Sequence, residues 1–530
     1  MNSSQLPSSR GLRTALTGAF GLGAVSVLGF APFGWFPLPI LALALLLSLW
    51  RRAGSRRRAA LVGFAFGLGF FLAGVSWVYV SLHEFGAMPA PLAALATLLF
   101  CAYLAAFPAI AGYCFVAAPG GSGVKLAVLF PVAWTLAEWA RGWLFTGFPW
   151  LALGYSQVPV SPLAGYAPVL GIYGVTLATA ATAGLLIAAA SRTSTKDEGG
   201  GMRAEGNPRR VASLILNPSS LILALLWLGG WALHHVQWTA REGAPVSVSL
   251  LQGNVPQDLK WRPERVGATL EAYRQLAQST SSRLIILPET ALPLFIGEVP
   301  QTYLGELAAH ALQNRGDILI GAPERLPSGE YFNSVLSFGA SPTQQYRKSH
   351  LVPFGEFIPL RPLLGAIVAV LSIPLQDFSR GAPDQQPLRV AGLQIAINVC
   401  YEDAFGEEII RQLPAANVLA NVSNVAWFGR SIAPQQHLQI SQARALETGR
   451  YMLRATNTGA TAVIDDRGRV VKRAPEFTRA IVTHDVPGYN GETPYVRWGN
   501  SAVLALCVLL VAAAFGVARA RRISHSENPS

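Results

Sequence analysis

The chain has 530 residues, of which 51% are hydrophobic and only 13% are charged. This composition excludes an ordinary soluble protein of that length, and because the apolar residues are gathered into long blocks it indicates a membrane protein with a soluble domain attached. The net charge of +12 would suit a nucleic-acid-binding protein, but the basic residues cluster between the apolar blocks and no nucleic-acid-binding motif is present, so we expect no nucleic-acid partner.

Eight apolar runs are each near the roughly 20 residues that a helix needs to cross a bilayer. They lie at 12–30, 35–50, 59–79, 91–118, 124–145, 167–190, 214–233 and 501–518. The first run has no small-residue cleavage pattern, so we expect a retained span and not a signal peptide. Residues 191–210 are polar and rich in glycine, which predicts an exposed loop.

The arginines predict the orientation of these spans. If the N-terminus is cytoplasmic, eight crossings place the arginines of 51–58, the loop at 191–210 and the C-terminal arginines on the cytoplasmic side. The segment between the seventh and eighth runs then lies on the opposite face, which in a bacterium would be the periplasm. We therefore predict a transmembrane bundle over 1–240, a periplasmic domain over 241–495, and an eighth helix with a cytoplasmic tail over 496–530.

The predicted periplasmic domain alternates strand and helix patterns. Short β-rich runs lie at 246–252, 283–287, 318–320, 331–338, 393–399 and 418–422, and helical periodicity covers 263–276 and 435–450. This pattern predicts an α/β domain of about 250 residues, long enough for its own core. Walker, GxGxxG, CxxC and HExxH motifs are absent from the sequence, and we expect no cofactor and no metal.

Cys400 ends the apolar run LQIAINV and is followed by Tyr401, Glu402 and Asp403. The other three cysteines lie in apolar segments, so Cys400 has no partner for a disulfide within the soluble region. A free cysteine is most often a small buried hydrophobe, and the alternative is a nucleophile. The segment alone leaves both interpretations open.

Two other charged residues also follow apolar strands. Glu289 comes after RLIILP, and Lys348 lies in QQYRKSHLVPFGEF, which also contains Glu356. Each alone is usually a cap or a solvated surface charge. Together with Cys400 they are complementary, since a carboxylate can take the thiol proton and an ammonium can stabilise a thiolate and an oxyanion. This combination predicts acyl transfer through a thioester.

Histidine offers a competing way to activate the thiol. His350, His437 and His484 lie in the same domain, and His350 would share a strand face with Lys348. We favour His350 as a hydrogen-bonding residue beside the pocket.

Longer motifs make the chain recognisable. LPET, YRKSHLVPFGEF and NVCYED, in that order, resemble the Glu-Lys-Cys pattern of the nitrilase superfamily, and EWARGWLFTGFPWLALGYSQ, QGNVPQDLKW and NVSNVAWFG resemble the apolipoprotein N-acyltransferase family. The resemblance implies a nitrilase-like αββα sandwich on eight transmembrane helices. The implied reaction moves an acyl chain from a phospholipid donor in the bilayer to the α-amino group of a diacylglyceryl apolipoprotein.

The resemblance also implies residue roles. Glu289 would be the general base, Lys348 the oxyanion-stabilising residue and Cys400 the nucleophile. Supporting pocket residues would be Trp261, Glu356, Tyr401 and Glu402. The chain departs from the family at Val425, where we expect an aspartate after Asn424, and this departure weakens any binding role for that loop.

The lipid substrates direct attention to two further places. Residues 362–375 form an apolar run of 14 residues, too short for an ordinary span, which we interpret as an interfacial arm or lid, with a buried core helix as the alternative. Glu138 and Arg141 share a helix face at the end of the fifth run, and we expect Arg141 to hold a lipid headgroup phosphate or to stabilise docking of the domain.

Two other functions compete with the transferase. A membrane-tethered nitrilase-type amidase would use the same three residues with water as the acceptor. A transporter or scaffold with an inactive domain would need no thiol chemistry at Cys400.

Overall fold

The computed structural model describes residues 9–197, 217–359 and 378–526, so the predicted arm at 362–375 lies outside the described residues. The chain forms two compact units. One unit comprises Met1–Ser76, Leu95–Val236 and Asn500–Ser530, and the other comprises Trp77–Ala94 and Gln237–Gly499. The stretch Trp77–Ala94 therefore belongs to the unit that contains the α/β domain.

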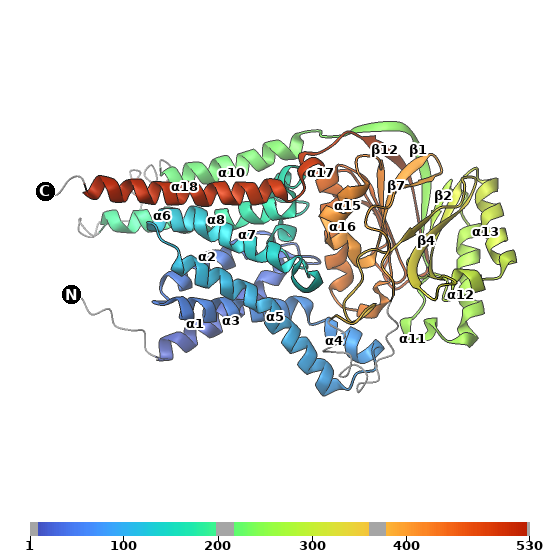
Figure 1. The fold of residues 1–530 in the computed structure, drawn as a ribbon, viewed down its shortest axis with the longest axis horizontal. Helices are drawn as coiled ribbons and strands as arrows, with labels where there is room; N and C mark the ends of the chain where they lie inside the picture. The colour runs from blue at the N-terminus through green and yellow to red at the C-terminus, as the bar shows by residue number, and fades with distance from the viewer. Residues whose placement is uncertain (1–8, 198–216, 360–377, 527–530) are drawn as a thin grey trace. The chain divides into compact units, whose positions relative to one another are not determined.

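The first unit is helical (Figure 1). Its longer helices are α1 (Ser9–Ser26), α2 (Pro37–Arg51), α3 (Arg56–Val75), α5 (Ala90–Ala117, mostly in this unit), α7 (Phe130–Arg141), α8 (Ala167–Asp197), α10 (Pro218–His235) and α18 (Ser501–Ser526). Glycines let α1 and α3 approach closely, because a Cβ at Gly23 would lie only 1.9 Å from the carbonyl oxygen of Phe66.

Five helical stretches among the described residues are long and apolar enough to cross a membrane. They are Arg10–Gly29, Arg56–Val75, Ala90–Ala117, Ser122–Arg141 and Pro162–Ser191. Helix α2 and the apolar part of α18 are shorter, and α10 is not among the five. The five apolar helices are confirmed, while membrane crossing by all eight predicted runs stays a prediction.

Three predicted bounds are wrong, and one of them is the end of the fifth run, which was expected at residue 145 whereas α7 ends at Arg141. The third apolar run was expected to reach residue 79, but α3 ends at Val75. The loop predicted over 191–210 is wrong for residues 191–197, because α8 continues to Asp197 through a polar stretch that contains no glycine or proline to end it.

The second unit contains two six-stranded sheets. Their orders are β12-β1-β2-β3-β4-β5 and β11-β10-β9-β8-β7-β6, with parallel pairs at the centre of each sheet. The strands are β1 (Ala240–Gln252), β2 (Leu284–Ile286), β3 (Asp317–Arg325), β4 (Tyr331–Gly339), β5 (Gln345–Arg347), β6 (Leu388–Val390), β7 (Leu393–Val399), β8 (Val418–Ser423), β9 (Met452–Thr456), β10 (Ala462–Ile464), β11 (Val470–Arg473) and β12 (Ala480–Asn490). All six predicted β-rich runs form strands.

Alternating side chains place these sheets face to face. In β2, Leu284 and Ile286 lie in the core between the sheets, while Ile285 packs in the outer cluster with residues of α12 (Pro263–Gln278) and α13 (Gln301–Gln313). On the other side, Ala396 of β7 packs in a cluster with Leu438 of α16 (Ala433–Thr448). Helices therefore cover both outer faces of the paired sheets, which confirms the predicted α/β domain (Figure 1).

Candidate active site

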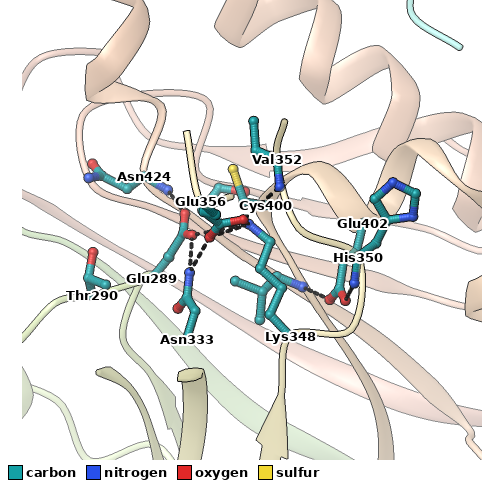
Figure 2. Close-up of polar contacts among 12 residues, drawn as sticks. Glu289, Thr290, Asn333, Lys348, His350, Val352, Glu356, Cys400, Glu402 and Asn424 are labelled. Atoms are coloured by element: carbon teal, nitrogen blue, oxygen red, sulfur yellow. Dashed lines mark hydrogen bonds and ion pairs between the residues drawn. The ribbon is translucent and has the colours of Figure 1, made fainter. Parts of the chain in front are cut away.

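The three residues predicted to carry the chemistry lie together at strand ends. Lys348 directly follows β5 and Cys400 directly follows β7, while Glu289 lies three residues beyond β2. The Lys348 Nζ is 3.7 Å from Glu289 Oε1. Figure 2 shows the Cys400 sulfur beside this pair, although the three side chains come from two different sheets.

Lys348 is buried and fixed from both ends. Its backbone N–H donates to the carbonyl oxygen of Asn333 at 2.8 Å, and its Nζ lies 2.9 Å from Glu356 Oε1 and 2.8 Å from Oε2. Burial alone would lower the pKa of Lys348, but the carboxylates of Glu356 and Glu289 outweigh it, so the pKa lies above its ordinary value. The side chain is therefore a protonated, immobile ammonium at neutral pH.

Glu289 accepts hydrogen bonds on both carboxylate oxygens. Asn333 Nδ2 donates to Oε1 at 2.7 Å, and the backbone N–H of Asn424 donates to Oε2 at 2.7 Å. Asn333 also donates to Glu356 at 3.1 Å, so one amide holds both carboxylates that surround Lys348. Asn333 was not predicted as a site residue, and it lies in the largely buried strand β4.

Cys400 has the backbone conformation of a sharp turn. Its φ is 55°, in the left-handed region that non-glycine residues rarely adopt, and its carbonyl oxygen accepts from Asn421 Nδ2 at 3.0 Å and from His437 Nε2 at 3.1 Å. Burial raises the pKa of the Cys400 thiol, Glu289 raises it further, and Lys348 partly opposes them. The resting thiol is therefore neutral, and a base must take its proton when a substrate arrives.

A buried polar network lies behind this turn. Asp403 accepts from His437 Nε2 at 2.6 Å, from Ser441 Oγ at 2.5 Å and from Arg454 Nη1 at 3.1 Å. Burial opposes ionisation of Asp403, but His437 and Arg454 outweigh it and hold its pKa below the usual value. His437 thus connects the backbone of the Cys400 turn to the Asp403 carboxylate.

His350 is a hydrogen-bonding residue, as we favoured. Its Nδ1 lies 2.9 Å from Glu408 Oε1, and its ring stacks on Phe405 with a centroid distance of 3.7 Å. Tyr401 completes this aromatic group, with its ring 5.0 Å from that of Phe405. These contacts pack the segment after Lys348 against the turn that carries Cys400.

Glu402 connects the same two segments through hydrogen bonds. Its Oε1 accepts from the backbone N–H groups of Ser349 and His350 at 2.6 and 3.0 Å, and its Oε2 accepts from the backbone N–H of Val399 at 2.7 Å. Burial raises the pKa of Glu402, and these donors partly oppose that shift. Glu402 therefore orders the backbone on either side of the site (Figure 2).

Trp261 is exposed, unlike these buried residues. Its side chain is 51% exposed and borders a largely apolar hollow of about 310 Å³. The hollow is lined by Trp261, Pro293, Leu294, Phe295, Glu298, Pro323, Tyr331 and Phe378.

The loop with the unusual Val425 contributes through its backbone. Val425 is fully buried, and the preceding Asn424 supplies the N–H bound to Glu289. This support does not require a carboxylate at position 425.

Arg141, in the helical unit, is buried and bound to nearby backbone. Its Nη1 donates to the carbonyl oxygens of Phe148 and Trp150, each at 2.6 Å, and its guanidinium lies 5.2 Å from the ring of Phe71. Glu138 accepts from the backbone N–H of Leu153 at 2.9 Å. The pair holds the segment after α7, so Arg141 has a structural role there, and its contact with a headgroup or with the docked domain stays a prediction.

We expect Arg141→Met to destabilise the helical unit by about 3 kcal/mol, because two buried carbonyl oxygens lose a charged donor. Thermal unfolding in detergent measures this effect. The matched control is Arg57→Met, since Arg57 is exposed at the start of α3. Equal unfolding midpoints for the two variants would contradict the assignment.

Comparison with known proteins covers nearly the whole chain. Residues 22–185 match the model of the apolipoprotein N-acyltransferase N-terminal domain, and residues 247–495 match that of the carbon-nitrogen hydrolase domain. The apolipoprotein N-acyltransferase of Nitrosomonas europaea is 54% identical over 508 residues, covering 94% of this chain and 96% of the relative. That of Methylococcus capsulatus is 46% identical over 514 residues, covering 96% and 97%. The chain therefore belongs to the apolipoprotein N-acyltransferase family, a family of enzymes with a carbon-nitrogen hydrolase domain.

Proposed function

We propose that this enzyme moves an acyl chain from a phospholipid to the N-terminal amino group of a diacylglyceryl apolipoprotein through a thioester on Cys400. The observation that carries the proposal is the grouping of a neutral thiol, a carboxylate fixed by two donors and an immobile ammonium at Cys400, Glu289 and Lys348. The chain's membership of the family and its five apolar helices support lipid substrates.

In the first half-reaction, Glu289 takes the proton of Cys400 as Sγ attacks the ester carbonyl of the phospholipid. The new S–C bond forms a tetrahedral intermediate, and the Lys348 ammonium stabilises its oxyanion. Collapse breaks the ester C–O bond, and Glu289 returns the proton to the departing lysophospholipid oxygen. The acyl chain remains on sulfur as a thioester.

In the second half-reaction, the α-amino group of the acceptor attacks the thioester carbonyl. Lys348 again stabilises the oxyanion, and Glu289 takes a proton from the attacking nitrogen. The C–S bond then breaks, and the sulfur recovers a proton from Glu289. The products are an amide and the free Cys400 thiol.

Glu356 keeps Lys348 in place through both steps. Its two oxygens contact the Lys348 Nζ, while the backbone N–H of Val352 donates to it at 2.8 Å (Figure 2). We assign Glu356 this supporting role because its carboxylate is already bound to Lys348, whereas Glu289 is held mainly by Asn333 and Asn424.

We also propose the topology that the sequence predicts. Eight crossings would place both termini in the cytoplasm and the domain over 241–495 in the periplasm of the inner membrane. Lipoprotein substrates would reach the active site on that side.

Intact-mass analysis of the purified protein in detergent tests the proposal. Phospholipid alone should add the mass of one acyl chain, hydroxylamine should remove it, and a diacylglyceryl-cysteine peptide should accept it on its amino group. The absence of any adduct would contradict the thioester. Release of free fatty acid at the same rate with and without the peptide would instead support the amidase.

A further inference from the structure

Lys260 is a buried charged residue that the proposed mechanism does not use. It ends the short helix α11 (Gln257–Lys260), and its side chain is 1% exposed, whereas the next residue, Trp261, is half exposed. The Lys260 Nζ donates to Thr290 Oγ1 at 2.7 Å and lies 3.5 Å from the carbonyl oxygen of Glu289. Lys260 thus contacts the backbone turn that carries the proposed general base.

This turn has a conformation that requires support. Thr290 has a φ of 45°, in the left-handed region, which is unfavourable for a β-branched residue. Such backbone strain persists only where the surroundings fix it. Because Thr290 follows Glu289 directly, the strained residue belongs to the same turn as the proposed base.

Helix α11 also reaches Glu289 from the carboxylate side. Gln257 Oε1 accepts from Asn424 Nδ2 at 2.8 Å, and the backbone N–H of Asn424 donates to Glu289 Oε2 at 2.7 Å. One turn of helix therefore holds the backbone of Glu289 through Lys260 and its side chain through Gln257 and Asn424.

We propose that Lys260 is a positioning residue for Glu289, holding the Thr290 turn so that the carboxylate faces Lys348 and Cys400. This inference rests on the role proposed above for Glu289 as the base. It predicts that Lys260 acts on the rate of acyl-enzyme formation and leaves binding of the donor unchanged.

The charge of Lys260 also predicts how the acylation rate depends on pH. Burial lowers the pKa of Lys260 to about 7, and the Glu289 carboxylate, the titratable group that faces it, partly opposes that shift. As pH rises through about 7, Lys260 loses its proton and the positive charge beside Glu289 disappears. Loss of this charge removes a repulsion on the thiol proton as it moves to Glu289, so the acylation rate of the unaltered enzyme should rise across this interval.

The test compares Lys260→Met and Thr290→Val, singly and together, with the control Lys472→Met. Lys472 is exposed and donates to the carbonyl oxygen of Thr483 at 2.7 Å. The maximal rate of acyl-enzyme formation per folded protein is measured against phospholipid concentration and pH, and alkylation of Cys400 by iodoacetamide is followed in parallel.

Each variant of Lys260 or Thr290 should lower the maximal rate about 10–100-fold with an unchanged half-saturating donor concentration. The double variant should match Lys260→Met, because both changes remove the same hydrogen bond. The rise near pH 7 should be missing in Lys260→Met, and the control should behave as the unaltered enzyme.

Maximal rates within twofold of the unaltered enzyme for both single variants would overturn the inference. If Lys260→Met does not fold, Thr290→Val alone decides. If the unaltered enzyme forms no acyl adduct, the proposed function fails, and the alkylation rates still show whether Lys260 supports activation of the Cys400 thiol.

Discussion

Cys400→Ser will lower the rate of acyl-enzyme formation by about four orders of magnitude or more. A serine hydroxyl is far less acidic and less nucleophilic than a thiol. Burial and Glu289 already raise the pKa of Cys400, so the same surroundings would oppose ionisation of a hydroxyl still more strongly. The time course of the intact mass after mixing with phospholipid measures the loss.

Cys114→Ser is the matched control for this prediction. Cys114 is an exposed cysteine in α5, so the same atomic change there should leave the rate unaltered. The Cys400 variant should retain the native unfolding midpoint, because sulfur and oxygen differ little in size. Acylation of Cys400→Ser at a tenth of the native rate would rule out the proposed nucleophile.

The strands that the sequence predicts share strong burial. β7 and β8 are almost fully buried and rich in β-branched residues, so their local pattern suffices. The missed strands include β9, which is fully buried, and β12, which has 11 residues, while other missed strands are short or exposed. β10 has three residues, and β11 has a largely exposed pattern, so both depend on pairing with neighbouring strands.

The candidate site divides in the same way. Glu289 and Cys400 are conspicuous because each follows an apolar run, whereas Lys348 follows the polar stretch QQYR and precedes an apolar turn. Asn333 and Lys260 do not stand out in the sequence. Both contact the turn formed by Glu289 and Thr290, which lies 29 to 44 residues away along the chain. Such contacts depend on how the strands and α11 pack, which local periodicity does not reveal.

Arg141 shows why a charge in an apolar segment is hard to interpret. In the sequence, Arg141 is a charged residue within an apolar segment, and such residues are rare enough to indicate a functional site. Its partners are backbone carbonyls seven and nine residues further along the chain, and every residue carries such a group. Only the path of the chain after α7 shows that the charge is bound internally.

Glu289→Gln will lower the rate of acyl-enzyme formation by about 10²–10⁴-fold, because an amide cannot take the thiol proton. The change keeps the side-chain size but costs a hydrogen bond. Asn333 Nδ2 and the backbone N–H of Asn424 both donate to Glu289, and an amide has only one oxygen to accept them. The control is Glu306→Gln, since Glu306 is half exposed and 3.6 Å from Arg274.

The pH dependence separates loss of the base from loss of position. Without a base, the reaction requires Cys400 that is already ionised. Below the pKa of Cys400, the fraction of enzyme with an ionised Cys400 rises tenfold for each pH unit. Burial keeps that pKa raised, although removing the Glu289 charge lowers it somewhat. The rate of Glu289→Gln should therefore climb steeply from neutral to alkaline pH and approach that of the unaltered enzyme. A constant deficit across this range would show that Glu289 only holds the site in shape, and that another group takes the proton from Cys400.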